Sequence, residues 1–397
     1  MTASQSPALL MLSHYFEEQR GGIEIVAAAL ARELSSLGFA VVWLGTGIAD
    51  KQCARSAYRK RPLAASRLAE KVLGIPYPLL LPSAWRAILR EAACSEVVLV
   101  HDALYMTSLI GWLGARLHGK PLVIVQHVGF VPFRSALLRA LMRLANRLVA
   151  APLLRRADRA IFISELTSRQ FAGVRWRRLP ALVFNGVDTS TFSPPSAPQI
   201  EHARRALNLP NDLPIALFVG RFVEKKGVQV LESMARLRDD ILFVLAGRGL
   251  LDPRSWRLPN VRVYSDLSGP TLAPLYHASD VLLLPSSGEG FPLVVQEALA
   301  CGLPVICGSD TARADSAAAG FLTGVEVDLA RTRETALRFS AELTRTLARR
   351  WTAADRRERF EFVRERYSWA TSATRYAGIL REVVGTLAGR SGALSSE

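Results

Sequence analysis

Short apolar runs alternate with helical patterns along this chain, and this alternation constrains the fold more than any other feature. Apolar runs of strand length occupy residues 8–12, 39–44, 97–100, 122–126, 160–164, 181–184, 215–219, 241–246, 261–264, 281–284 and 305–307. Amphipathic segments such as residues 23–37, 107–117 and 228–237 lie between them. Strands that alternate with helices predict parallel, doubly wound sheets. Because 397 residues exceed the length at which one core keeps growing, two such domains are expected.

The stretch after the run at residues 281–284 is the most informative motif. It begins Pro285-Ser-Ser-Gly-Glu-Gly-Phe-Pro, and residues 293–300 then have helical spacing. Glu289 is therefore predicted on a strand-to-helix loop and Glu297 inside the helix. Backbone N–H groups near Gly290 could approach an anion at the helix N-terminus, whereas two carboxylates suit the neutral hydroxyls of a sugar. The plain alternative is that both glutamates are solvated.

Two further motifs follow apolar runs in the first half. Gly21-Gly22 comes after the polar loop at residues 13–20 and before a helical pattern, which would let backbone approach a phosphate. The dinucleotide fingerprint G-x-G-x-x-G is absent, and a tight turn explains the glycines equally well. His127 directly follows the run at residues 122–126, so it is predicted at the ligand-binding edge of the sheet. A structural histidine is the alternative.

A basic loop follows the first apolar run of the second half. Arg221 and Lys226 are five residues apart between the run at residues 215–219 and the helical pattern at residues 228–237. Two cations on a strand-to-helix loop are suited to neutralising a diphosphate. A solvated basic loop would have the same sequence.

Taken in order, these motifs resemble the signature of the retaining glycosyltransferases of family 4. Seven residues separate Glu289 from Glu297, with Gly-Phe-Pro after the first and Ala-Leu-Ala-Cys-Gly-Leu-Pro-Val after the second. Gly-Gly-x-Glu at residues 21–24 and Gly-Arg…Lys-Gly at residues 220–227 are similar to other motifs of that family. The resemblance implies the GT-B architecture, an α/β fold of two facing Rossmann-like doubly wound domains.

The resemblance also implies the domain limits. Residues 1–186 would form the acceptor-side domain and residues 187–370 the domain that binds a nucleotide sugar. Residues 371–397 would supply a helix that returns to the first domain, followed by a disordered tail. Asn185-Gly-Val-Asp188, with the proline-rich stretch after it, is the predicted linker.

Roles for individual residues follow from the resemblance. It implies that His127 and Glu289 are catalytic and lie near the transferred sugar, and that Glu297 holds the ribose. The remaining donor-binding residues would be Gly21, Gly22, Arg221, Lys226, Gly290, Phe291, Pro292 and Leu293. Glycosyl transfer separates a cationic sugar from an anionic leaving group, so the site must stabilise both charges. No Asp-x-Asp signature is present, and no metal or other cofactor is expected.

The net charge of +15 predicts an anionic partner. Residues 131–180 contain eleven arginines and no lysine, and Arg139, Arg143 and Arg147 recur every fourth residue beside a row of leucines. Such a helix can lie on an anionic membrane surface, or its leucines can belong to the core. Arg59-Lys-Arg61 is a second basic segment in the same half. No nucleic-acid motif is present, so nucleic acid is not expected as a partner.

The remaining sequence features limit the setting. The four cysteines form no C-x-x-C pair, which predicts buried free thiols and neither zinc site nor disulfide framework. No apolar run has the length of a spanning helix, and residues 1–7 lack the basic flank of a secretion signal. We therefore expect a cytoplasmic enzyme at the inner face of the cell membrane, with a glycan or lipid-linked acceptor, in cell-envelope polysaccharide or lipopolysaccharide synthesis. A nucleotide-sugar epimerase, a phosphorylase of the same architecture and a basic polymer-binding protein are the alternatives.

Overall fold

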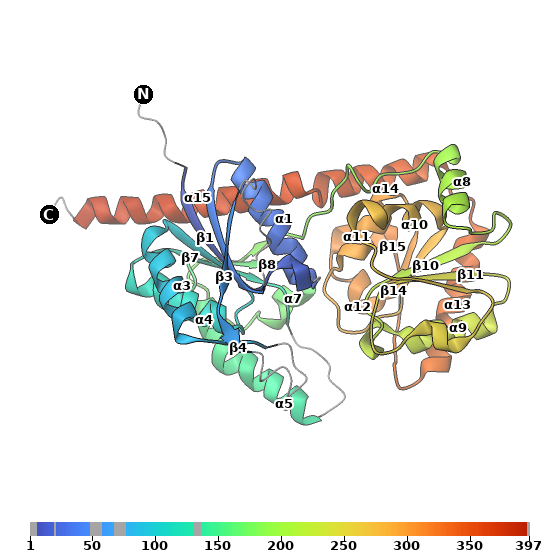
Figure 1. Ribbon diagram of the computed structural model, residues 1–397, viewed down its shortest axis with the longest axis horizontal. Helices are drawn as coiled ribbons and strands as arrows, with labels where there is room; N and C mark the ends of the chain where they lie inside the picture. The colour runs from blue at the N-terminus through green and yellow to red at the C-terminus, as the bar shows by residue number, and fades with distance from the viewer. Residues whose placement is uncertain (1–5, 20, 48–57, 67–76, 130–135, 395–397) are drawn as a thin grey trace. The chain divides into compact units, whose positions relative to one another are not determined.

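The structure of the chain, a computed structural model, describes residues 6–19, 21–47, 58–66, 77–129 and 136–394. It divides into two compact units (Figure 1). Unit 1 consists of Met1–Asn185 and Trp369–Glu397, and unit 2 of Gly186–Ser368. The sequence places the limits after residues 186 and 370, and the structure divides the chain after Asn185 and after Ser368.

Unit 1 is built on a parallel sheet with the strand order β3-β2-β1-β6-β7-β8-β9. The strands are β1 (Ala8–Tyr15), β2 (Ala40–Thr46), β3 (Arg59–Leu63), β6 (Val97–His101), β7 (Leu122–Gln126), β8 (Arg159–Phe162) and β9 (Ala181–Leu182). The short strands β4 (Ala65–Ser66) and β5 (Leu79–Leu80) form a separate antiparallel pair. Parallel sheets are covered on both faces, which explains the continuous apolar runs of β1, β6 and β7.

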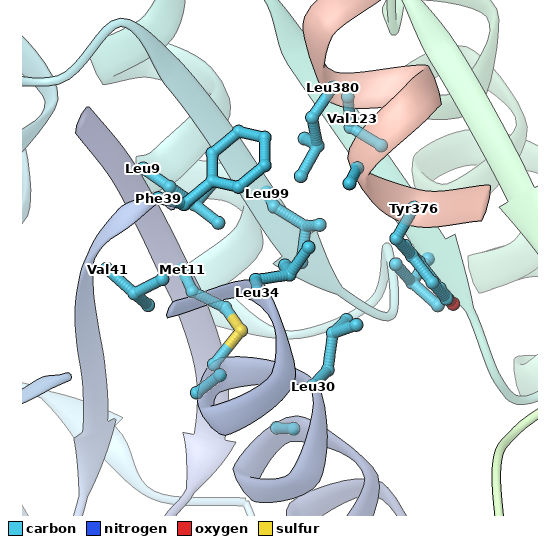
Figure 2. Close-up of a cluster of buried hydrophobic side chains, with 14 of the residues drawn as sticks. Leu9, Met11, Leu30, Leu34, Phe39, Val41, Leu99, Val123, Tyr376 and Leu380 are labelled. Atoms are coloured by element: carbon cyan, nitrogen blue, oxygen red, sulfur yellow. The ribbon is translucent and has the colours of Figure 1, made fainter. Parts of the chain in front are cut away.

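Helices surround this sheet, and apart from α5, whose described leucines are exposed, they bury apolar residues against it. They are α1 (Gly22–Ser36), α3 (Pro82–Cys94), α4 (Met106–Leu117), α5 (Ala136–Ala145), α6 (Ala151–Arg156), α7 (Glu165–Gln170) and α15 (Trp369–Leu394), with a π-helical stretch Asn146–Ala150 between α5 and α6. Figure 2 shows Leu30 and Leu34 of α1 beside Met11 and Leu99 of the strands. These side chains belong to one buried cluster.

The C-terminal helix α15 packs on unit 1. Tyr376 and Leu380 enter the cluster of Figure 2, and both are almost fully buried. Arg381 donates a hydrogen bond to the backbone oxygen of Leu37 at 2.8 Å, and Arg178 pairs with Glu382 at 2.9 Å. The last element of the chain therefore completes the core of the first unit.

Unit 2 has a parallel sheet with the order β12-β11-β10-β13-β14-β15. The strands are β10 (Ile215–Val219), β11 (Leu242–Ala246), β12 (Val261–Tyr264), β13 (Val281–Leu284), β14 (Val305–Gly308) and β15 (Leu322–Val325). The helices are α8 (Ala197–Ala206), α9 (Val228–Leu237), α10 (Ala273–Ala278), α11 (Leu293–Ala300), α12 (Ser309–Ala312), α13 (Thr332–Ala348) and α14 (Ala353–Arg366). Each unit, taken by itself, confirms the predicted Rossmann-like doubly wound fold.

The strand order of each sheet reverses once. In unit 1 the reversal lies between β1 and β6, and in unit 2 it lies between β10 and β13. Ligands of doubly wound sheets bind at the carboxyl ends of the strands that flank such a switch point. The loops after β1 and β6, and those after β10 and β13, are therefore where the site residues of each unit should lie.

Three local features differ from the sequence interpretation, and contacts of the side chains explain the first two. Residues 13–15 continue β1 instead of opening a loop, because Trp43 Nε1 donates to Ser13 Oγ at 2.8 Å and satisfies that buried hydroxyl. The basic segment Arg59-Lys-Arg61 lies in β3, and its cations pair with Glu17, Glu18 and Glu91. Cys94 is exposed, whereas Cys301 and Cys307 are buried as predicted, and Cys53 lies outside the described residues.

Across the described residues, no helix has both the length and the apolar character that crossing a membrane requires.

Candidate active site

The glycine pair Gly21-Gly22 begins α1 directly after the loop that follows β1. Gly21 is the N-cap residue, and a Cβ placed on it would lie 2.0 Å from a carboxylate oxygen of Glu24. The Glu24 carboxylate thus folds back over the first glycine, and a side chain there would displace it. A Cβ on Gly22 would meet nothing within 4 Å. The backbone at Gly22 is thus open to a ligand, but a carboxylate stands beside it.

His127 is in direct contact with a second histidine. His127 follows β7, His101 ends β6, and His101 Nδ1 lies 2.9 Å from His127 Nε2. His127 is 8% exposed and His101 is fully buried. Burial lowers the pKa of His127 to about 3, and burial, followed by the neighbouring His127, lowers the pKa of His101 well below 6.5. Both imidazoles are neutral at neutral pH, so His127 acts as a neutral hydrogen-bonding group.

Asp102 fixes the chain on both sides of this histidine pair. Its backbone is left-handed, with a φ of 67°, and its side chain is buried. The carboxylate accepts hydrogen bonds from the backbone N–H of Val128 at 2.9 Å and from Gln126 Nε2 at 3.1 Å. Burial raises the pKa of Asp102 to about 6, and these hydrogen bonds act in the opposite direction. The strained aspartate therefore links the end of β6 to the residues around His127.

An aromatic cluster lies at the carboxyl end of β1. The His14 ring stacks on Tyr105 with centroids 4.1 Å apart, and Tyr77 lies 5.0 Å from the same ring. Both ring nitrogens of His14 are buried without a hydrogen-bond partner among the described residues. Burial lowers the pKa of His14 to about 3. Burial, and after it the carboxylates of Asp102 and Glu24, raise the pKa of Tyr105 well above 10. This cluster is consequently neutral and aromatic, with the charges of two carboxylates near it.

Sequence reasoning missed His14, His101, Asp102 and Tyr105. The signal used for His127, a histidine at the end of an apolar run, would also have found His101, and His14 just beyond the run at residues 8–12. Nothing in the sequence indicates that the rings of His101 and His127 meet, because 26 positions separate them.

In unit 2, the predicted cations occupy the loop after β10. Arg221 is exposed and makes no ion pair with any described residue. Lys226 ends a short 3-10 helix, Glu224–Lys226, and Gly227 caps α9 in the left-handed region with a φ of 71°. A Cβ on Gly227 would lie 2.1 Å from the backbone oxygen of Pro285. Only glycine fits here, so the cationic loop is held directly against the loop after β13.

Glu289 lies in that second loop and meets the cations. Lys226 Nζ donates to Glu289 Oε2 at 2.9 Å, and Lys225 Nζ lies 3.3 Å from Glu289 Oε1. Burial opposes the charge of Glu289, but Lys226 and Lys225 together hold its pKa below its usual value. Burial lowers the pKa of Lys226, with Glu289 acting against it. With Arg221 included, the cluster carries three cations and one carboxylate, and the excess positive charge suits an anion.

Glu297 occupies α11 and is bonded to a tyrosine. Tyr276 Oη donates to Glu297 Oε2 at 2.6 Å. Burial raises the pKa of Glu297 to about 7, and the Tyr276 hydrogen bond acts in the opposite direction. Tyr276 is fully buried and meets Phe192 edge-on at 5.5 Å. Tyr276 was not identified from the sequence, and nothing in the sequence signals its pairing with Glu297.

The four predicted donor-binding residues that follow Glu289, Gly290 to Leu293, lead into α11. Pro292 is the N-cap residue with an extended backbone, and Leu293 is the first helical residue. Phe291 is 2% exposed and its ring lies 5.0 Å from that of Tyr367. The Phe291 side chain therefore anchors the loop to the core, and only its backbone is available to a ligand. Gly290 precedes it in the same loop.

The predicted residues lie at the carboxyl ends of the strands, at the switch point in unit 2 and at or next to it in unit 1. Unit 1 brings Gly21, Gly22 and His127 to the carboxyl ends of β1 and β7, and unit 2 brings Arg221, Lys226 and Glu289 together after β10 and β13. A single cleft that joins the two groups remains a prediction. Among the described residues, no group of three or more His, Cys, Asp or Glu side chains is arranged to hold a metal ion, and metal independence also remains a prediction.

Two family models match this chain. The Glycosyltransferase Family 4 model matches residues 20–191, and the model of glycosyl transferases group 1 matches residues 199–339. Curated relatives named D-inositol 3-phosphate glycosyltransferase include that of Corynebacterium kroppenstedtii, 27% identical over 319 residues, which cover 72% of this chain and 69% of the relative. That of Mycolicibacterium smegmatis is 28% identical over 302 residues, covering 67% of this chain and 68% of the relative.

Solved structures share the fold at low identity. Sucrose-phosphate synthase from Thermosynechococcus elongatus has a TM-score of 0.73 at 19% identity, covering 96% of this chain and 100% of that one. Anabaena HepE, in complex with UDP and glucose, has a TM-score of 0.71 at 17% identity, covering 95% and 100%. WaaG, a glycosyltransferase involved in lipopolysaccharide biosynthesis, has a TM-score of 0.65 at 17% identity, and the match covers 94% of this chain and 99% of WaaG. The two family models and this shared fold show that the chain belongs to the GT-B glycosyltransferases of group 1, family 4.

Proposed function

We propose that this protein is a retaining, metal-independent glycosyltransferase that moves a sugar from a nucleotide-diphosphate sugar to a glycan or lipid-linked acceptor. The observation that carries the proposal is the cluster of Arg221, Lys225 and Lys226 around Glu289 at the switch point of unit 2. A site with more cations than carboxylates favours a leaving group on which negative charge grows. The complex of HepE with UDP and glucose supports a nucleotide sugar as donor.

The donor would enter the cluster by competing for its ion pairs. The diphosphate would take hydrogen bonds from Arg221 and Lys226, which frees part of the Glu289 carboxylate to accept from sugar hydroxyls. Backbone N–H groups at Gly290 and at the start of α11 would add to the positive electrostatic potential around the diphosphate. Glu297 would accept a hydrogen bond from the ribose. The ion pair of Lys226 with Glu289, whose side chains are 12% and 13% exposed, would thus keep both groups ordered until the donor binds.

The acceptor half of the reaction is assigned to unit 1. Neutral His127, oriented by His101, would contact the transferred sugar and orient the reacting groups. The backbone at Gly22 would approach the diphosphate, although the Glu24 carboxylate makes this contact weaker than those of Arg221 and Lys226. Both assignments rest on the family's arrangement of its two domains.

The acceptor is an uncharged sugar in this proposal. Glu24 and Asp102 lie near the aromatic cluster of His14 and Tyr105, and carboxylates repel a phosphorylated acceptor. D-inositol 3-phosphate is the second candidate, because curated relatives carry that name. Transfer assays with both acceptor classes decide between them: product with inositol phosphate and none with unphosphorylated glycans would reverse the choice.

The central test uses Arg221, which is exposed and pairs with no described residue, so its removal should leave folding unchanged. UDP-, GDP- and ADP-sugars are screened for thermal stabilisation, and the active donor is assayed with Arg221→Ala. We expect roughly tenfold weaker donor binding. Arg205→Ala, an exposed arginine of α8 without a described partner, is the matched control. Equal donor affinity in the two variants would contradict the proposed diphosphate site.

The stereochemistry and metal dependence have separate readouts. NMR of the fresh product reports the anomeric configuration, and inversion would refute retention. Activity that EDTA abolishes and added Mg²⁺ or Mn²⁺ restores would refute metal independence. Product analysis with and without acceptor distinguishes transfer from epimerisation and phosphorolysis.

We also propose that α5 attaches the protein to the inner face of the cell membrane, as suits envelope polysaccharide or lipopolysaccharide synthesis. Leu137, Leu141, Leu144 and Leu148 form one stripe of α5 and its π-helical extension, and they are 77, 57, 51 and 62% exposed. The arginines at positions 139, 143 and 147 flank this stripe. The alternative in which the leucines belong to the core does not hold for these residues, and exposed leucines beside arginines fit an anionic leaflet.

Vesicle flotation tests the membrane proposal. The wild type should float with phosphatidylglycerol vesicles and less with phosphatidylcholine vesicles. The triple variant Leu141→Gln, Leu144→Gln, Leu148→Gln should lose flotation. Its matched control carries Leu179→Gln, Leu250→Gln and Leu337→Gln, because these leucines are 78, 95 and 52% exposed elsewhere on the surface. Equal flotation of both triple variants would contradict α5 as the contact.

A further inference from the structure

A basic groove of about 440 Å³ opens in unit 1 at the amino end of the sheet. It is lined by Leu122, the first residue of β7, together with side chains from the ends of α4 and α6 and from residues 175–177. His127 follows the opposite end of β7. Leu122 and His127 are five positions apart, roughly 16 Å along an extended strand, so the groove is distinct from the candidate active site.

The groove collects positive charge that the protein itself does not neutralise. Its cations are Arg116, Lys120, Arg155, Arg156, Arg175 and Arg177, and Asp158 is the one acid in its lining. Asp158 already accepts from the backbone N–H of Leu122 at 2.9 Å and pairs with Arg177 at 3.3 Å. Arg116, Lys120, Arg155 and Arg175 make no ion pair or side-chain hydrogen bond with any described residue.

Favourable interactions with helix C-termini explain the positions of only some of these cations. Arg116 lies in the last turn of α4, and Arg155 and Arg156 in the last turn of α6, where a cation is favourable. Lys120 and Arg175 lie outside both helices, so that explanation does not apply to them. Cations that converge on one concave surface repel each other, and a bound anion removes this repulsion.

Two tryptophans in the lining indicate that the ligand contains rings as well as negative charge. Trp112 and Trp176 are half-buried in the lining of the groove, and Trp176 is held edge-on against Phe162 at 5.7 Å. An indole face packs against ring-shaped ligands, and the volume lies within the range of small-ligand sites, about 300–1,000 Å³. The lining therefore suits a molecule that carries both rings and negative charges.

We propose that the basic groove binds an anionic saccharide, with phosphate or carboxylate groups held by the unpaired cations and sugar rings packed on the tryptophans. Saccharide is favoured over other ring-bearing polyanions because the chain belongs to a glycosyltransferase family. The concave shape favours a single glycan chain over a flat membrane, which α5 would contact instead. This inference concerns binding away from the transfer site and does not depend on which sugar is transferred.

The test compares phosphorylated dextran with unmodified dextran on the full-length protein by calorimetry. Arg155→Glu with Arg175→Glu reverses two exposed, unpaired cations of the groove. The matched control, Arg32→Glu with Arg375→Glu, changes the net charge equally at exposed arginines of α1 and α15 in the same unit. We expect the wild type and the control to bind phosphorylated dextran alike, the groove variant to bind roughly tenfold more weakly, and unmodified dextran not to bind.

The outcomes separate the alternatives. Equal weakening in both double variants would mean attraction to net charge alone and would overturn the groove as a site. Tighter binding of a thymidine oligonucleotide or of phosphatidylglycerol vesicles through the same two arginines would overturn saccharide as the ligand class. Trp176→Leu supplies an independent readout, because it removes the ring without changing the charge: loss of binding supports ring packing, and unchanged binding contradicts it.

Discussion

His101 Nδ1 lies 2.9 Å from His127 Nε2, so two buried imidazoles from neighbouring strands share one hydrogen bond. One nitrogen of this pair carries the proton, and the other accepts. The choice fixes the tautomer of His127 and hence whether Nδ1 of His127 donates or accepts. His101 thereby acts on His127 as a positioning residue, and Asp102 holds the backbone around both.

Replacing His101 should alter the tautomer of His127. In His101→Leu, we expect a fall of about tenfold to a hundredfold in kcat with little change in the donor KM. Nitrogen NMR of labelled histidine would show a changed tautomer of His127, which a general loss of stability does not produce. An unchanged His127 spectrum with reduced kcat would mean that His101 acts only through packing.

The buried histidine His14 should make the protein sensitive to acid. Its pKa is about 3 in the folded chain against an ordinary value of 6.5, so between these values the unfolded chain holds one more proton. The free energy of unfolding must then fall as pH decreases from 6.5 towards 3. His14→Phe keeps a ring on Tyr105 and removes this dependence. When urea unfolding is measured at several pH values between 3 and 6.5, the free energy of unfolding of this variant should change with pH less steeply than that of the wild type, by about 1.4 kcal/mol per pH unit. An unaltered slope would contradict a neutral, buried His14.

Donor affinity should depend on pH through Glu297. The pKa of Glu297 is about 7, so the carboxylate that we propose accepts a hydrogen bond from the ribose is lost as pH falls through that value. Tyr276→Phe removes a hydrogen bond that lowers this pKa, and the midpoint of donor affinity should therefore move to higher pH. Calorimetry of donor binding at several pH values with the wild type, Tyr276→Phe and Glu297→Gln measures this midpoint. The Glu297→Gln variant should lack the transition, and a transition that persists there would assign it to another group.

Two glycines should respond oppositely to alanine. Gly227→Ala forces a Cβ towards the Pro285 oxygen at a φ of 71°, and we expect a loss of about 1–3 kcal/mol in the free energy of unfolding. Gly22→Ala meets nothing within 4 Å at the start of α1, so stability should hold or rise. If a ligand approaches the Gly22 backbone, activity should nonetheless fall. Gly378→Ala, equally open in α15, is the control, and equal activity of Gly22→Ala and Gly378→Ala would remove Gly22 from the site.

The sequence alone determined most of the local structure. The strands Leu122–Gln126, Ile215–Val219, Val261–Tyr264 and Val281–Leu284 and the helices Val228–Leu237 and Leu293–Ala300 begin and end where the patterns predicted. Each of these elements has its apolar pattern bounded by Gly, Pro or polar residues, so it can be predicted from neighbours along the chain. The placement of Glu289 on a loop and Glu297 in a helix follows from the same patterns.

Tertiary structure decided what the side chains meet. The sequence showed Arg221, Lys226 and Glu289 as three separate residues, whereas the order of strands in unit 2 brought Lys226 within 2.9 Å of Glu289. Nothing in the sequence indicates that Trp43 donates a hydrogen bond to Ser13, so the predicted strand at residues 8–12 ends before the observed β1 does. Whether the leucines of α5 are buried was also undecided, because amphipathic spacing is the same for a core helix and for one that leaves its apolar stripe exposed. Periodicity records which residues share a face, but only the arrangement of distant strands and helices determines what covers that face.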